Sequence, residues 1–172
     1  NIDLGYNALI AGRLDEAEMA LRKGMALDPT FPFARTNIMA VKVARKQYDS
    51  VHVYGEGATQ PLGAITELRA YIATGDTAKE RVMRDSARSM VFAKSKEPTG
   101  LGHAFFYAAI DDADSAFVWL NHAIDVKSSF FFTQGGLPCD PRVIQYRADP
   151  RFAMALRRLQ IEPCQASVAD VR

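Results

Sequence analysis

The feature that most constrains this fold is a set of small and helix-ending residues near the start of the chain. Leu4-Gly5 is followed by Gly12-Arg13-Leu14-Asp15-Glu16-Ala17 and then by Leu27-Asp28-Pro29. Gly5 allows two helices to approach closely, Gly12 ends the first helix, and Pro29 cannot continue the second. The pattern therefore predicts a pair of closely packed helices.

The turn of this first pair recurs along the chain. Gly12 has counterparts at Lys46, Gly75 and Asp111, at spacings of 34, 29 and 36 residues. Repetition at such a period is typical of a helical repeat protein, in which each pair of helices packs on the next. The irregular spacing indicates that the middle repeats have diverged.

Four helical pairs and no sheet are predicted from apolar residues that recur three and four positions apart. The residues of the fourth pair, such as Ala116, Trp119, Leu120 and Ala123, follow this spacing well. Alternation of period two is not sustained anywhere. The predicted pairs are 2–11 with 14–27, 32–45 with 47–56, 61–74 with 77–93, and 99–110 with 113–126.

The repeats are predicted to end near Lys127 and to be followed by a cap. Asp140-Pro141 and Asp149-Pro150 each place an aspartate before a proline, a combination that starts helices. A final helix from 150 to about 160 would cover the exposed core of the last repeat, as solenoids require. We expect one domain, with repeats over 1–127, a capping segment and helix over 128–160, and a flexible tail over 161–172.

Residues 4–29 and 103–159 carry a resemblance to tetratricopeptide (TPR) repeats, and in particular to the C-terminal TPR region of bacterial multidomain signalling proteins. Those proteins include serine/threonine kinases, winged-helix regulators and adenylate cyclases. The resemblance implies an all-α fold, a right-handed superhelix of about four TPR-like helical pairs with a C-terminal capping helix. It also implies a scaffold that regulates an attached output domain. Because the chain starts inside a helix, we expect it to be a fragment of a longer protein.

The composition of the chain limits the classes of partner that it is expected to bind. The 172 residues are 48% apolar and 24% charged, with a net charge of +1. This balance gives no electrostatic case for nucleic acid or for an anionic membrane, and apolar runs such as 104–110 are too short to span a bilayer. The compartment stays open: cytoplasmic, or extracytoplasmic if an upstream region carries a membrane helix.

The sequence offers no recognisable set of catalytic residues, so we expect a non-enzymatic protein without metal or cofactor. His52, His103 and His122 fall on three different predicted helices, with no acid at ligand spacing. The glycines at 100–102 and 135–136 lack the Lys-Ser/Thr of a phosphate-binding loop. A small hydrolase on a helical scaffold is the disfavoured alternative.

Cys139 and Cys164 are the only two cysteines. Without a Cys-x-x-Cys spacing, zinc is not indicated. Two free thiols are the favoured interpretation, and a bridge, stabilising by about 3 kcal/mol, is the alternative.

The binding surface implied by the resemblance is the groove lined by the first helix of each pair. The aromatic and apolar wall would hold a peptide, with Asn37 bonding its backbone and Arg69 an acidic group. The strongest candidates are Tyr6, Phe33, Asn37, Arg69 and Phe105, within a wider set that adds Ile2, Leu9, Thr36, Ala40, Ile65, Ile72, Leu101 and Ala108.

Two other fates of this groove stay open. The carboxylate clamp of chaperone-binding TPR domains is not expected, because Ile2 and Tyr6 stand where a Lys and an Asn are required. The alternative to an open groove is one that the chain's own termini or a second copy of the chain cover. A self-association module, forming a homodimer, is therefore the alternative to peptide binding.

Overall fold

The computed structural model describes residues 2–55, 60–92, 100–128 and 137–164. Within these residues all regular structure is helical and no strand occurs, as predicted. The predicted pairs are confirmed to within two residues at every end that the described residues include. The helices are α1 (Ile2–Ile10), α2 (Leu14–Leu27), α3 (Pro32–Ala44), α4 (Tyr48–Gly55), α5 (Pro61–Thr74), α6 (Thr77–Phe92), α7 (Leu101–Ala109), α8 (Ala113–Asp125), the short 3₁₀ helices η1 (Leu137–Cys139) and η2 (Ile144–Tyr146), and α10 (Pro150–Leu159).

The four predicted turns share one backbone conformation. Gly12, Lys46, Gly75 and Asp111 have φ of 75°, 56°, 74° and 59°, in the left-handed region. In each case the next residue donates its N–H to a carbonyl five residues back, as in the bond from Arg13 to Ala8 O at 2.9 Å. This is the Schellman end of a helix, and it confirms the alignment of the four pairs.

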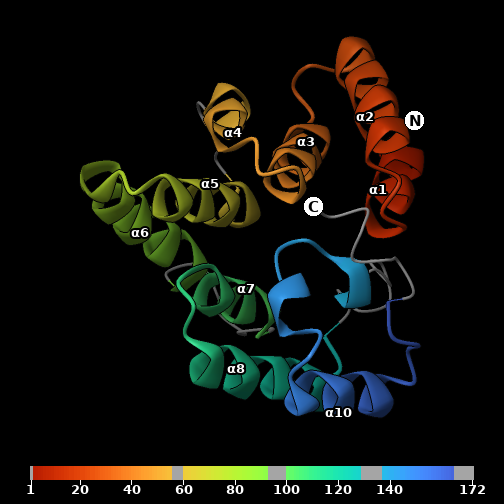
Figure 1. The fold of residues 1–172 in the computed structure, drawn as a ribbon, viewed down its shortest axis with the longest axis vertical. Coiled ribbons are helices and arrows are strands. Elements are labelled where there is room, and N and C mark those ends of the chain that lie inside the picture. Colours follow the sequence, from red (N-terminus) through yellow and green to blue (C-terminus); the bar gives the residue numbers. More distant parts are fainter. Residues whose placement is uncertain (1, 56–59, 93–99, 129–136, 165–172) are drawn as a thin grey trace.

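The helices follow one another around an arc (Figure 1). Each helix packs against the next, and the first helices of the pairs also contact one another in the series α1, α3, α5, α7. The 3₁₀ helices η1 and η2 lie inside this arc (Figure 1). The inner side of the arc, where a groove was expected, is therefore partly filled by the chain itself.

The first pair packs through its small residues, as the sequence predicts. A Cβ atom added to Gly5 would lie 2.5 Å from Leu21 Cγ, and one added to Gly24 would lie 2.5 Å from Ile2 Cγ1. Ala17 is fully buried in the same interface. A larger side chain at Gly5 or Gly24 would therefore require Leu21 or Ile2 to shift.

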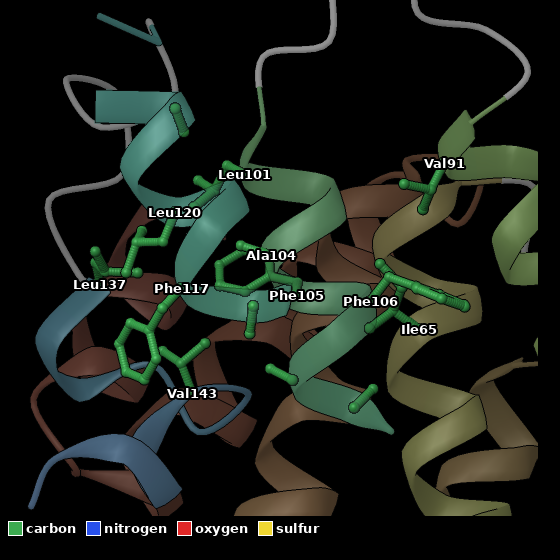
Figure 2. Packing of buried hydrophobic residues seen from close by; sticks show 14 of the residues in the cluster. Ile65, Val91, Leu101, Ala104, Phe105, Phe106, Phe117, Leu120, Leu137 and Val143 are labelled. Carbon is green, nitrogen blue, oxygen red and sulfur yellow. The ribbon is translucent and has the colours of Figure 1, made fainter. Parts of the chain in front are cut away.

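The largest apolar cluster joins the last two pairs to the cap. It includes α7 residues Leu101 and Phe105 and α8 residues Phe117 and Leu120. In Figure 2, Leu137 lies beside Leu120 and Val143 beside Phe117, so residues from the C-terminal region complete this core. From α10, Phe152 and Leu156 are buried in the same cluster. The predicted capping helix therefore covers the last pair.

The tail departs from prediction in two places. Asp149 caps α10 as expected, accepting a hydrogen bond from Arg151 N. Asp140 does not start an α-helix: a turn over 141–143 and then η2 follow it, and the Asp140 carboxylate accepts hydrogen bonds from Arg142 N and Nε. Residues 161–164 of the predicted flexible tail are held in place, whereas 165–172 and the aromatic run 130–132 lie outside the described residues.

The cysteines are bridged, contrary to the favoured interpretation. Cys139 and Cys164 form a disulfide with a Cα–Cα distance of 5.0 Å. Cys164 follows α10 and is joined to Cys139, the last residue of η1. Sequence separation alone did not reveal this proximity.

Candidate functional site

The main cavity has a volume of about 400 Å³ and opens where three helices begin. Among the described residues its lining is almost entirely apolar, with Thr36 and Gln60 as the polar members. Its lining comes from α3 (Pro32, Phe33, Thr36), from α5 and its preceding residue (Gln60, Pro61, Leu62, Ile65) and from α7 (Leu101, Gly102, Phe105). A cavity of this size and character is typical of a small-ligand site.

Local sequence explains why three helices begin at this cavity. Pro32 and Pro61 occupy the first position of α3 and α5, where a missing N–H costs nothing. Gly100, with a φ of 80°, precedes α7. Since α3, α5 and α7 are the first helices of successive pairs, their N-termini lie along one edge of the repeat.

The rest of the inner side is occupied by residues 137–147, here called the inner segment. Gln145 Nε2 donates to Ala108 O on α7 at 3.1 Å. Cavities of only about 20 Å³ separate the segment from α1 and α3 on one side and from α5 on another. The inner segment therefore packs tightly against the helices that were expected to line an open groove.

An ion pair anchors the inner segment. Arg142 donates from Nε and Nη2 to the two carboxylate oxygens of Asp140, and its guanidinium lies 5.4 Å from the ring centroid of Phe105. Burial, followed by the nearby carboxylate of Asp140, raises the pKa of Tyr6, so this phenol stays neutral. The charges at the centre of the arc are consequently paired with each other.

Two of the five predicted site residues line the main cavity. Phe33 on α3 and Phe105 on α7 are both among its lining residues. From the wider predicted set, Thr36, Ile65 and Leu101 line it as well. The structure thus brings together the part of the predicted groove near the helix N-termini.

The other three predicted residues do not face an open groove. Asn37 is fully buried, and its Nδ2 donates to Phe33 O on its own helix at 2.9 Å, so its side chain does not face an open groove and its bond to a peptide backbone stays a prediction. Tyr6 is buried against Phe33. Arg69 is paired with Asp111 at 2.7 Å and lies beside Gln145, so the chain itself supplies the acidic group expected of a partner.

Sequence reasoning missed Pro32, Gln60, Pro61, Leu62 and Gly102, which complete the cavity. The prolines carried a signal, because Pro32 and Pro61 begin α3 and α5 at the edge where these helices meet the cavity. It also missed the inner segment, although covering of the groove by the chain's own termini was among the alternatives.

The histidines lie on three helices and serve packing. His52 stacks on Tyr71, and His103 stacks on Trp119 with ring centroids 4.2 Å apart. The described residues contain no group of three or more His, Cys, Asp or Glu side chains arranged to hold a metal ion. In that same part of the chain no helix is both long and apolar enough to cross a membrane.

Comparisons with protein-family models, with curated proteins and with solved structures find no match to this chain.

Proposed function

We propose that this chain is a non-enzymatic binding domain, a TPR-like right-handed superhelix that takes a small ligand or the end of a peptide into its main cavity. The observation that carries the proposal is the apolar cavity of about 400 Å³ whose lining includes Phe33 and Phe105. In the signalling proteins that the sequence resembles, such a domain regulates an attached output domain, and we propose the same role here.

The position of the inner segment favours a local binding site over a groove that is open along its whole length. Arg142 and Gln145 are packed against α7, so an extended peptide lying along all four pairs would have to displace them. The cavity beside Phe33 needs no such displacement. Binding there would also contact α3, α5 and α7 together, which gives the ligand a means to change how successive pairs pack.

Gly102 provides a direct test of the cavity. It lines the cavity, and a Cβ atom added there meets no heavy atom within 4 Å. Gly102→Trp should therefore fill the site while the domain stays folded. The matched control is Ala78→Trp, because Ala78 is an exposed residue of α6.

The experiment is a ligand-observed NMR screen of apolar fragments and short peptides against the wild-type domain and both variants, with circular dichroism to verify folding. The proposal predicts ligands that bind the wild type and Ala78→Trp but not Gly102→Trp. If every ligand found binds Gly102→Trp as well as it binds the wild type, or if none is found, the cavity is not the functional site.

The second candidate is self-association through the first pair. Leu4, Met19 and Leu27 are large apolar residues exposed on α1 and α2. Sedimentation equilibrium distinguishes this role. A dimer that Leu4→Glu dissociates and that Val118→Glu, a change at an exposed residue of α8, leaves intact would favour self-association.

A further inference from the structure

We propose that two copies of this chain associate through one face of the first pair, so that the first pair of each copy covers α1 of the other. The face is formed by exposed residues of α1 (Asp3, Leu4, Asn7) and of α2 (Lys23, Leu27), and is called the first-pair face here. The inference deepens the second candidate function, self-association, on which it rests. It is carried by a comparison of equivalent positions in the four pairs and by the charges of the face.

Two positions of each first helix, eight and five residues before the turn, are buried in α3, α5 and α7. They are Ile38 and Val41 in α3, Glu67 and Ala70 in α5, and His103 and Phe106 in α7. Each of these side chains is at most 6% exposed. The same two positions of α1 are Leu4, which is 66% exposed, and Asn7, which is exposed as well. Helix α1 therefore presents to solvent a face that its counterparts bury.

The element that covers these positions in the other pairs is the second helix of the preceding pair. Glu67 on α5 lies against α4, where a Cβ atom added to Gly55 would fall 2.6 Å from the Glu67 Cδ. His103 and Phe106 on α7 pack edge-on against Phe92 of α6, with ring centroids 4.4 and 5.8 Å away. Helix α2 packs on α3 in turn. The repeat therefore specifies a helix as the occupant of the exposed face of α1.

The first pair is the part of a second copy that is open to supply this helix. A head-to-tail stack, in which α8 of one copy covers α1 of the next, is blocked because α10 already packs on α8. The contact that closes is a two-fold one, in which both copies use the same face. Lys23 and Leu27 extend that face onto α2, since they lie one turn apart on either side of Gly24, which packs on Ile2 at the start of α1.

The charges of the first-pair face complement each other under two-fold symmetry. Asp3 and Lys23 are both exposed, and neither has a hydrogen bond or an ion pair among the described residues. Each is close in sequence to a large exposed apolar residue, Asp3 to Leu4 and Lys23 to Leu27. A two-fold dimer that buries the two leucines pairs Asp3 of each copy with Lys23 of the other, so that both charges are matched twice.

The test uses this symmetry in sedimentation equilibrium of the wild-type chain and of two charge variants, Asp3→Lys and Lys23→Glu. Each variant alone places like charges opposite each other and should weaken the dimer at least about tenfold. An equimolar mixture of the two should recover a dissociation constant within about threefold of the wild type, because the heterodimer pairs opposite charges at both contacts. Recovery also shows that both variants are folded. Asp85→Lys, at an exposed acid of α6, is the matched control and should leave the dimer unchanged.

The outcomes distinguish this inference from the candidate function on which it rests. A wild-type dimer that neither charge variant weakens, or that the mixture of variants does not restore, would leave self-association standing and overturn the first-pair face as its site. A wild-type chain that stays monomeric up to about 200 µM would overturn both, and would leave the face to a helix from outside this sequence.

Discussion

Arg142 donates from Nε and Nη2 to the carboxylate of Asp140 at 2.7 and 2.5 Å, and both side chains are less than 5% exposed. An ion pair this deeply buried is costly to desolvate, and it is retained only where its hydrogen bonds are well made. The second Asp-Pro-Arg sequence, with Asp149 and Arg151, forms the same contacts at the surface. One local motif is thus used twice, inside the arc and outside it.

Removing the buried arginine should destabilise the domain strongly. Arg142→Met leaves the Asp140 carboxylate buried without its partner, and the expected loss is about 3–5 kcal/mol in the free energy of unfolding. Arg151→Met is the matched control at the exposed copy of the motif, where solvent screens the carboxylate and a smaller loss is expected. Urea unfolding followed by circular dichroism measures both. Equal losses in the two variants would show that the inner segment is not anchored by this pair.

The helical pairs were predictable because each depends on residues close in sequence. Gly12 and Gly75 predict their turns because glycine favours the positive φ found there. The apolar pattern of each helix depends only on residues a few positions apart. Lys46 and Asp111 adopt the same positive φ without being glycine, and only the repeat period identified them. The all-α class and the helix boundaries therefore followed from the sequence alone.

Half of the candidate site was not predictable in this way. Arg69 occupies a groove position by register, but the inner segment lies more than 60 residues further along the chain and packs beside it. Whether a segment returns to fill a groove depends on contacts such as that from Gln145 to Ala108 O, which no local pattern encodes. The sequence offered the bridge between Cys139 and Cys164 only as the alternative to two free thiols, and the preference for free thiols was wrong.

Two glycines in first helices should respond oppositely to alanine. In Gly5→Ala the new Cβ would lie 2.5 Å from Leu21 Cγ and 3.1 Å from its backbone nitrogen, so overpacking should cost about 1–3 kcal/mol. Gly102→Ala meets nothing within 4 Å and should gain up to about 1 kcal/mol from helix propensity. Thermal unfolding of the two variants tests this difference. A stabilised Gly5→Ala would contradict the close packing of α1 on α2.

The disulfide should make a large contribution to stability. Closing a loop of 25 residues restricts the unfolded chain by about 3 kcal/mol in the entropic model. Protein purified in air should show no thiol after denaturation and two per chain after reduction. The double substitution of Cys139 and Cys164 by alanine should lose about 3 kcal/mol relative to the oxidised protein, and no loss relative to it would indicate that the bridge is not formed in solution.

The stability of the domain should depend on pH through His103. Burial, and then the nearby His122, lowers the pKa of its imidazole from the usual 6.5. The unfolded chain therefore takes up a proton at His103 at a higher pH than the folded chain, so this contribution to stability is complete above pH 6.5 and is lost as the pH falls below it.

His103→Phe isolates that effect, because a phenyl ring keeps the contacts with Trp119 and Phe92 and does not titrate. Urea midpoints read from the fluorescence of Trp119, the sole tryptophan, at pH 7.5 and 5.5 provide the measurement. The wild type should lose more stability than the variant between these two values. Identical losses would mean that His103 is protonated as readily in the folded domain as in the unfolded chain, and that its stacking on Trp119 does not exclude the charged imidazole.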